Sequence, residues 1–376
     1  MKKNLICILV VALVVLVGCG KVNLANKNTE KEGSNSVDLP DNINEKNNTD
    51  DGSNNIEETL TVEDYYPFIE NKRMYYEGIG NEYASQEVYV DFIEDNKIQL
   101  RSSNGGTVVA KVVEVSDTEI KQVNSKEEFY YRQNIISEVS QGNKEEILLK
   151  EPLIVGTTWE TSDGGKKSIT AIDKEISTPY GSFSAIEVTR EDEEFQIKEY
   201  YAKNIGFVKS IFISNGSEIS TSLAKIEEKS QLQTMKFYYP ISEETKFVIK
   251  YKTIPVYFDT NDTIDDKILE NYKDYLPDNG VVLMSTNTKI NKLYVDTNQN
   301  IVYIDLNHKF IEEMNAGAEP ESLILQALTN TLGDYFNVDK ILLTIDGESY
   351  SSGHIELDKG QVLYVDYSDI AEIKNF

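Results

Sequence analysis

Two short runs decide the fold of the first half of this 376-residue chain: Glu87-Val88-Tyr89-Val90-Asp91-Phe92-Ile93 and Lys97-Ile98-Gln99-Leu100-Arg101. In both runs, β-branched, aromatic or aliphatic residues alternate with polar ones, which is the pattern of a half-buried strand. Asp95 and Asn96 stand between the runs and are residues that favour turns. The segment therefore predicts a pair of antiparallel strands joined by a tight turn.

Similar short runs extend on both sides of this pair. Asn104-Gly105-Gly106 precedes a run over residues 107–115, and Asp163-Gly164-Gly165 separates two further runs. Residues 199–209 contain two runs joined at Asn204. Strands repeated at ~8 to 12 residue intervals, with Asn-Gly and Gly-Gly turns, are typical of an antiparallel sheet, a half-barrel or a sandwich. We expect such a β-rich domain over residues 61–230.

The pattern changes at about residue 235 to a mixture of helices and strands. Two segments have apolar residues at helical spacing, and Pro320 stands where the first turn of a helix tolerates proline. This order predicts an α+β fold with helices on one face of a sheet. The predicted elements are strands at 235–240 and 246–258, a helix at 263–276, a hairpin of 289–296 with Ile301–Leu306, a helix from Pro320 with the core stripe Ile324, Leu328, Leu332, Tyr335 and Phe336, and a strand at Lys340–Ile345.

The N-terminus has the features of a bacterial lipoprotein signal. Lys2 and Lys3 precede an apolar run over residues 5–17, which is shorter than the ~20 residues that span a bilayer. Leu16-Val17-Gly18-Cys19 matches a lipobox, in which the cysteine is acylated and becomes the new N-terminus. We therefore predict a signal peptide at 1–18 and lipidation at Cys19. Residues 19–60 are rich in Asn, Lys, Asp, Glu, Ser and Thr, which predicts a disordered tether.

Composition excludes several classes of protein. The chain has 37 Lys and Arg against 64 Asp and Glu, a formal charge of -27, so it lacks the basic footprint of a nucleic-acid binder. It has two cysteines, too few for a disulfide scaffold. Cys7 lies in the predicted signal and Cys19 is the predicted lipidation site. Thiol catalysis, redox Cys pairs and Cys-based zinc sites are therefore excluded.

Histidine chemistry has little support in the sequence. The two histidines are His308 and His354, and neither belongs to an H-E-x-x-H motif or a similar metal-ligand spacing. His354 follows Ser351-Ser352-Gly353, but a catalytic triad also needs a positioned base and orienter, and no G-x-S-x-G motif is present. We interpret His354 as a structural turn residue and His308 as a residue at the start of a helical turn. We predict no catalytic residues, no metal site and no cofactor.

Acidic and aromatic clusters admit both structural and functional interpretations. Residues 259–270 resemble the ligand order of an EF-hand loop, but Ile264 stands where the loop needs glycine. A helix N-cap with acidic residues in the first turn explains them better. The sequence gives no reason to assign Asp305 or the run Glu191-Asp192-Glu193-Glu194 as glycosidase acids. We interpret the run as a solvated turn. The 23 tyrosines could stack on sugars, but in the pairs 65–66, 130–131, 200–201 and 238–239 we expect one ring in the core and one in solvent.

The C-terminal part resembles the GerMN domain of sporulation and germination lipoproteins. The resemblance covers residues 235–360 and rests on stretches in the family's order and at plausible spacing. These are Ile301-Val302-Tyr303-Ile304-Asp305-Leu306 and Phe310, the helix from Glu321 to Leu332 with its Thr331-Leu332 pair, Val338-Asp339-Lys340-Ile341 up to Asp346-Gly347, and Gly353-His354-Ile355-Glu356-Leu357. One copy of the domain is present, whereas some members carry two, and residues 361–376 form a tail.

The resemblance implies a small α/β domain similar to ring-building motifs. Members of the family are extracytoplasmic, often lipoproteins, and the resemblance transfers no catalytic residues. We therefore expect a non-enzymatic lipoprotein on the outer face of the bacterial cell membrane, acting as a scaffold or interaction module in envelope assembly, in sporulation or germination. Expected partners are membrane lipid through acylated Cys19 and envelope proteins or peptidoglycan; homo-oligomer formation stays open. The alternative is a ligand-binding module for cell-wall glycan or an extracellular solute, and a weaker one is a hydrolase with an unrecognised carboxylate pair.

Overall fold

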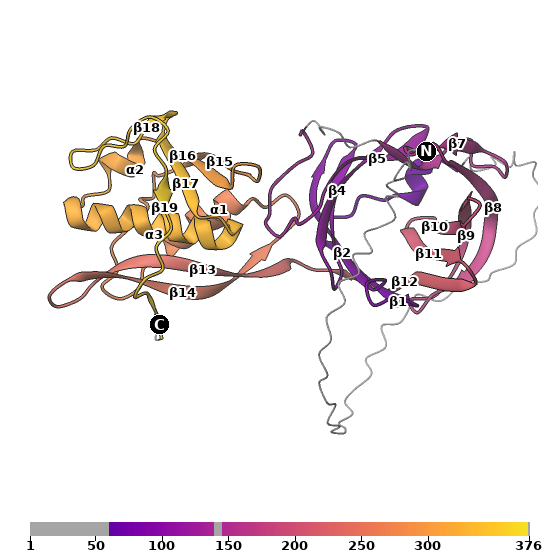
Figure 1. Cartoon of the computed structure of the whole chain (residues 1–376), viewed down its shortest axis with the longest axis horizontal. Helices are drawn as coiled ribbons and strands as arrows, with labels where there is room; N and C mark the ends of the chain where they lie inside the picture. The colour runs from indigo at the N-terminus through magenta and orange to yellow at the C-terminus, as the bar shows by residue number, and fades with distance from the viewer. Residues whose placement is uncertain (1–59, 139–144, 375–376) are drawn as a thin grey trace, which may run out of the picture. The chain divides into compact units, whose positions relative to one another are not determined.

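The computed structural model describes residues 60–138 and 145–374, and residues 58–376 form one compact unit. The unit combines a long antiparallel sheet with a smaller α/β part (Figure 1). A short 3-10 helix, η1 (Val62–Tyr65), precedes the sheet. Predicted features within residues 1–59, including the signal peptide, Cys19 and nearly all of the tether, lie outside the described residues.

Twelve strands form one antiparallel sheet that is rolled up on itself (Figure 1). The order of strands is β6-β5-β4-β3-β2-β1-β12-β11-β10-β9-β8-β7, so neighbours in the chain pair except for β6 and β7, which are the two edges, and β1 pairs with β12 to connect the two halves. The strands are β1 (Lys72–Ile79), β2 (Gln86–Glu94), β3 (Lys97–Ser103), β4 (Val108–Val115), β5 (Glu119–Lys126), β6 (Glu146–Lys150), β7 (Thr158–Glu160), β8 (Lys166–Ser177), β9 (Ser182–Glu191), β10 (Phe195–Ala202), β11 (Gly206–Ser214) and β12 (Ser217–Glu228).

The two edge strands of the rolled sheet approach each other through side chains. The indole Nε1 of Trp159 on β7 donates to the carbonyl oxygen of Ile147 on β6 at 3.0 Å, and Lys167 pairs with Glu146 at 3.4 Å. Apolar side chains from β1 to β12 and from η1 fill the inside of the roll. The predicted antiparallel β-rich fold is confirmed, and it is one rolled sheet and not a sandwich of two.

The α/β part contains two sheets and three helices. A long hairpin pairs with the C-terminal β20 (Ala371–Glu372), and it consists of β13 (Gln231–Ser242) and β14 (Phe247–Phe258). In the second sheet, β15 (Ile290–Asp296) is antiparallel to β16 (Ile301–Leu306), which is parallel to β17 (Lys340–Ile345); β18 (Glu348–Ser349) and β19 (Leu363–Tyr364) pair with β17. The helices are α1 (Ile264–Asp274), α2 (Lys309–Glu312) and α3 (Ala318–Phe336).

Helix α3 lies between the two sheets, which corrects the expectation of helices on one face of a single sheet (Figure 1). The predicted stripe is buried at Ile324, Leu328, Leu332 and Phe336. The opposite side of the helix is also covered, so even Thr331 is fully buried, and its hydroxyl oxygen accepts from the backbone N–H of Tyr238 on β13 at 3.0 Å. The strands at 231–258 form their own sheet because a hairpin satisfies its backbone hydrogen bonds locally.

Candidate functional site

A buried carboxylate lies between two arginines where the rolled sheet meets the α/β part. Asp91 is on β2 at a β-bulge, and it is fully buried. Its Oδ2 accepts from Nε of Arg101 on β3 at 2.9 Å, and its Oδ1 accepts from a terminal nitrogen of Arg132 at 2.9 Å. Both arginines are 1% exposed. We call Asp91, Arg101 and Arg132 the arginine cluster.

Arg132 extends the arginine cluster into the α/β part. Its Nε donates to the carbonyl oxygen of Asp262 at 2.6 Å, and a terminal nitrogen donates to that of Asp259 at 2.7 Å. The guanidinium lies 4.8 Å from the ring centre of Phe92 and 5.0 Å from that of Phe258. Since charge-assisted hydrogen bonds in a buried site are strong, Arg132 couples the two parts of the unit.

Arg101 keeps one buried nitrogen without a partner. Its terminal nitrogen Nη2 has no hydrogen bond within the described part of the chain. The guanidinium instead lies 5.3 Å from the ring centre of Tyr89 and 5.6 Å from that of Phe129. Aromatic faces attract cations, and this attraction offsets part of the cost of the missing hydrogen bond.

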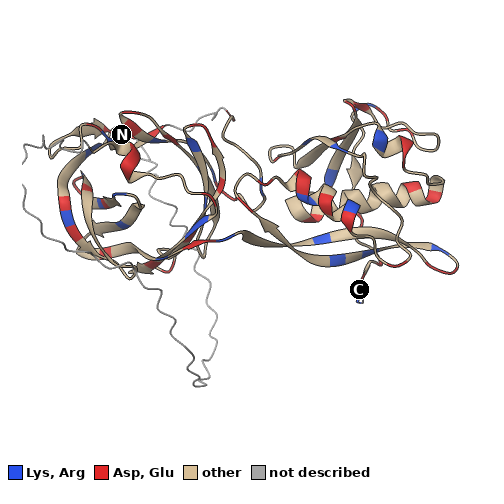
Figure 2. Ribbon diagram, turned by 180° about the vertical axis from the view of Figure 1, so that it is seen from behind, with Lys and Arg blue, Asp and Glu red and all other residues tan. Residues whose placement is uncertain are grey.

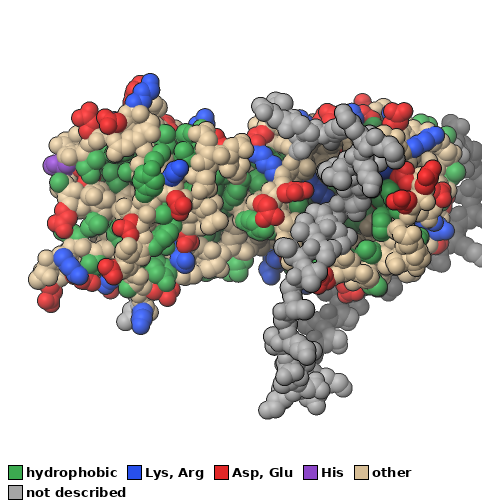
Figure 3. Space-filling view, in the orientation of Figure 1, with side chains coloured by type: hydrophobic (Ala, Val, Ile, Leu, Met, Phe, Trp, Pro, Cys, Tyr) green, Lys and Arg blue, Asp and Glu red, His purple; other side chains and the backbone are tan. Residues whose placement is uncertain are grey.

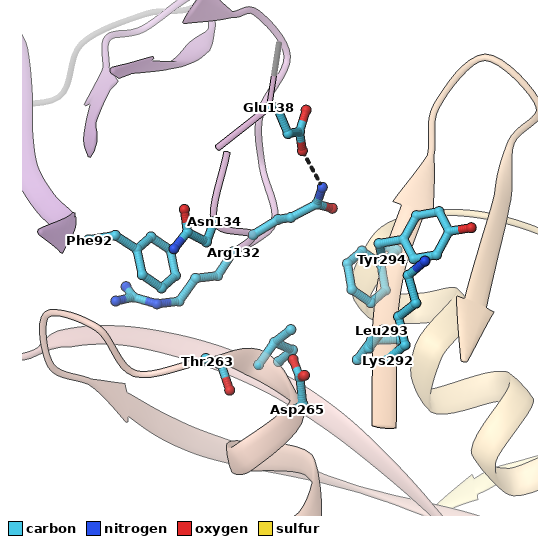
Figure 4. A pocket seen from close by; sticks show the side chains of 12 residues that line it. Phe92, Arg132, Asn134, Glu138, Thr263, Asp265, Lys292, Leu293 and Tyr294 are labelled. Atoms are coloured by element: carbon cyan, nitrogen blue, oxygen red, sulfur yellow. Dashed lines mark hydrogen bonds between the residues drawn. The ribbon is translucent and has the colours of Figure 1, made fainter. Parts of the chain in front are cut away.

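A cavity of about 490 Å³ lies beside the arginine cluster (Figure 4). Its walls come from the segment after β5, from the N-terminal turn of α1 and from β15. Five lining residues are apolar or aromatic, and the other seven carry amide, hydroxyl or charged groups. The lining residues are Phe92, Arg132, Gln133, Asn134, Glu138, Thr263, Ile264, Asp265, Lys292, Leu293, Tyr294 and Phe336.

Two of the four charged side chains that line the cavity are engaged within the protein. Arg132 belongs to the arginine cluster, and Glu138 accepts from Gln133 at 2.8 Å and pairs with Lys126. Asp265 and Lys292 have no ion pair within the described residues. Burial, with a smaller contribution from the charge of Asp266, raises the pKa of Asp265 above its ordinary value.

The lining of the cavity combines apolar and aromatic side chains with amide and charged ones. Its lining includes no Ser, Cys or His, and the hydroxyl of Thr263 donates to Asp266 at 2.9 Å. The described residues contain no group of three or more His, Cys, Asp or Glu that could hold a metal ion. Within 60–138 and 145–374, no helix is both long and apolar enough to cross a membrane.

Both histidines, His308 and His354, lie on the surface of the protein. His308 precedes α2, and its Nε2 lies 3.7 Å from the carboxylate of Glu312. The backbone N–H of His354 donates to Ser352 Oγ at 3.0 Å, and this hydroxyl donates to the buried carboxylate of Glu321. Ser352 therefore organises a turn and is not oriented by the imidazole of His354.

The acidic candidates have structural roles. Thr263 is the N-cap of α1, with its hydroxyl accepting from the N–H of Asp266 at 3.2 Å, so the cap interpretation of residues 259–270 is confirmed. Residues 191–194 are exposed between β9 and β10, as a solvated turn. Asp305 accepts from Thr344 at 2.6 Å and from the N–H of Gly347 at 2.7 Å. Burial raises its pKa, but these hydrogen bonds and one from Asn291 outweigh burial and lower it.

The prediction of one buried and one exposed ring in each tyrosine pair is wrong for 200–201 and 238–239, and in the pair 65–66 Tyr65 is buried and Tyr66 is half-buried. It holds for 130–131, where Tyr130 is exposed and Tyr131 is buried. Tyr200 and Tyr201 are both buried, and a β-bulge falls between them. Residues 238 and 239 are both buried because β13 has covering groups on both faces.

Neither the arginine cluster nor the cavity was predicted from the sequence. Asp91 gave a local signal, since it interrupts an apolar strand, and Arg101 ends the next run. Nothing local distinguishes Arg132, Asp265 or Lys292 from the many other charged residues. The contact of Arg132 with Asp262 spans 130 residues of the chain, and Asp265 and Lys292 come from two separate elements, α1 and β15.

Comparison with known proteins identifies the α/β part. Residues 236–351 match the model of the family Germane, described as sporulation and spore germination. No curated protein matches the chain. Among solved structures, the tandem GerMN domains of the sporulation protein GerM from Bacillus subtilis are similar at 18% identity, with 35% of this chain and 45% of that chain covered and a TM-score of 0.26. The chain thus spans less than half of that structure.

Two further solved structures cover larger shares of this chain. An exported protein with a YmcC-like fold from Bacteroides fragilis is 12% identical, with 43% of this chain and 98% of that chain covered and a TM-score of 0.28. A lipoprotein from Parabacteroides distasonis is 15% identical, with the same shares covered and a TM-score of 0.28. The family match agrees with the resemblance found in the sequence. Residues 236–351 are therefore a Germane domain, related to GerMN domains, of the family of sporulation and spore germination.

Proposed function

We propose that this protein is a lipid-anchored extracytoplasmic interaction protein, without enzymatic activity, that contributes to an envelope assembly in sporulation or germination. The observation that carries the proposal is the Germane domain at 236–351. The lipobox that ends at Cys19 supports attachment to the outer face of the cell membrane.

Each segment of the chain has its own role in this proposed function. Residues 1–18 direct export, and acylated Cys19 with the rest of 19–60 tethers the folded part. The β-rich domain 61–230 and the Germane domain 235–360 supply contact surfaces, and 361–376 is a tail. In the described structure, segments of this tail already pair with the α/β part, since β19 pairs with β17 and β20 with β14.

The Germane domain carries a partly apolar sheet face that suits protein contacts. Tyr294, Tyr303 and Leu342 lie in one row across β15, β16 and β17, and the two tyrosine rings stack at 4.8 Å. The next row across β16, β17 and β19 ends with Tyr364, which is 61% exposed. Figure 3 shows hydrophobic side chains among charged ones over this part of the molecule. Exposed aromatic residues of this kind are enriched in protein interfaces.

Site-specific crosslinking in cells tests the contact surface. A photoreactive phenylalanine analogue replaces Tyr303 on this face, and in a control it replaces Tyr257, which is 56% exposed on β14. We expect adducts with envelope proteins or with a second copy from position 303 and none from position 257. Equal yields, or no adduct at 303, would refute an interface on this face.

Deletion of the gene tests the biological role. We expect fewer heat-resistant, germinating spores with normal vegetative growth. A Cys19→Ala complement should fail to restore the spore count if lipid attachment is needed, whereas the unchanged gene should restore it. Normal spore numbers after deletion would contradict a role in sporulation or germination.

A second candidate function is binding of cell-wall glycan by the rolled sheet. The observation that favours it is an aromatic pair in which exposed Tyr180 stacks on half-buried Phe183, with ring centres 6.3 Å apart and planes at 4°. Such flat rings bind sugar faces through stacking. Saturable binding to purified peptidoglycan that is lost in Tyr180→Ala and kept in Tyr130→Ala would support this function. Absence of binding would exclude it.

A further inference from the structure

The lining of the cavity beside the arginine cluster includes two opposite charges, Asp265 and Lys292, that form no ion pair within the described residues. Asp265 comes from the first turn of α1 and Lys292 from β15, so the two charges belong to different walls (Figure 4). Lys292 Nζ lies 4.7 Å from the ring centre of Tyr294 and has no ion pair within 60–138 and 145–374. Asp265 is half-buried, whereas Lys292 is exposed and lies opposite Asp305 across β15 and β16. The cavity is thus lined by a half-buried carboxylate and by an exposed ammonium group, neither of which forms an ion pair within the described residues.

The rest of the lining favours an apolar group between these charges. Phe92, Ile264 and Phe336 are almost fully buried and line the floor, and Leu293 and Tyr294 line the side. A volume of about 490 Å³ lies within the range of roughly 300–1,000 Å³ that is usual for small-molecule sites. The cavity can therefore hold a molecule with an aliphatic or aromatic side chain.

The walls are held in place before any ligand binds. Arg132 donates hydrogen bonds to Asp91 and to backbone carbonyl oxygens. Gln133 donates to Glu138 and accepts from the N–H of Val295 at 3.4 Å. Thr263 fixes the N-terminus of α1 as its cap. A preorganised site loses little conformational entropy on binding.

We propose that this cavity binds a small zwitterion, an α-amino acid or short peptide with an apolar side chain, with its ammonium group on Asp265 and its carboxylate on Lys292. The partial burial that disfavours the charge of Asp265 becomes an advantage when an ammonium group pairs with it. The binding site goes beyond the proposed contact function, because it takes a small molecule and does not depend on lipidation, although Tyr294 lines the cavity and also belongs to the sheet face around Tyr303.

Equilibrium dialysis with full-length protein in detergent micelles tests the site. The probes are L-leucine and L-phenylalanine, together with isoamylamine and 4-methylpentanoate, which are leucine without its carboxylate and without its amine. We expect saturable binding of an amino acid at micromolar to millimolar concentration and binding at least about tenfold weaker for both truncated analogues.

Matched variants locate the bound probe. Asp265→Asn and Lys292→Met should each weaken amino-acid binding roughly ten- to a hundredfold, as the loss of a hydrogen bond to a charged group does. Glu270→Gln, on an exposed position of α1, and Lys289→Gln, just before β15, should bind like the unchanged protein. Circular dichroism melting curves check that all variants fold.

Three results would overturn the proposal. The first is no saturable binding of either amino acid to the unchanged protein. The second is isoamylamine binding as tightly as L-leucine, which would show that Lys292 does not hold a carboxylate. The third is amino-acid binding that neither cavity variant weakens, which would place the ligand elsewhere. None of these results depends on the spore count or on crosslinking at position 303.

Discussion

Replacement of Asp91 by alanine should be among the most destabilising single changes in this protein. Asp91 is fully buried, and both of its carboxylate oxygens accept from arginine side chains at 2.9 Å. Asp91→Ala leaves two buried guanidinium groups without their counter-charge. Breaking a buried ion pair in this way costs about 3–5 kcal/mol. Since about 1.4 kcal/mol is a factor of ten, the unfolding equilibrium should shift by roughly a hundredfold or more.

The control is a partly solvent-exposed ion pair between Glu87, on the same strand as Asp91, and Arg73 on β1. Glu87 on β2 lies 2.5 Å from Arg73, and their side chains are 29% and 21% exposed. Glu87→Ala should cost at most about 1 kcal/mol, because an exposed ion pair contributes little. The contrast between the two variants therefore isolates the effect of burial from that of removing one carboxylate.

Urea unfolding followed by tryptophan fluorescence measures both free energies. The chain has one tryptophan, Trp159, which is buried where β6 and β7 approach each other. Simultaneous replacement of Asp91 by leucine and of Arg101 and Arg132 by methionine should recover part of the loss, since buried ion pairs can be replaced by apolar residues. A loss below about 1 kcal/mol for Asp91→Ala, or one equal to that of Glu87→Ala, would refute this account of the arginine cluster.

Three further predictions concern other parts of the molecule. Burial lowers the pKa of Lys72 to about 8, although the charge of Glu228 raises it. Between about pH 8 and 10 the unfolded chain therefore binds more protons than the folded one. The free energy of unfolding should rise with pH in this window by at most about 1.4 kcal/mol per pH unit. Urea titrations at several pH values should find a smaller slope in Lys72→Met; equal slopes would contradict the shift. Thr263→Ala should lower the free energy of unfolding by about 1 kcal/mol through loss of the cap of α1, and an unchanged urea midpoint would count against it. Tyr350→Phe removes a 2.7 Å hydrogen bond to buried Glu321 and should cost roughly 1.5–3 kcal/mol, whereas Tyr364→Phe, at an exposed position, should leave the melting temperature unchanged.

Local pattern in the sequence was enough to predict most of the individual elements. Alternation and turn residues around Asp95 and Asn204 predicted strands that the structure contains, and helical spacing predicted α1 and α3. The cap at Thr263 was also predictable, because a cap depends on residues within one helical turn. The Germane domain could be found in the same way, since its motifs follow the chain order.

Closure of the sheet and the candidate site depend on contacts that no local pattern encodes. The two halves of the rolled sheet are joined where β1 pairs with β12, with Lys72 opposite Glu228, and its edges meet where Trp159 of β7 donates to β6. Helix α3 is enclosed because a separate hairpin covers its second face. The arginine cluster joins Asp91 to Arg132, and the cavity then brings Asp265 of α1 toward Lys292 of β15. Alternation shows which side chains share a face of a strand, but which distant segment covers that face is decided by packing of the whole chain.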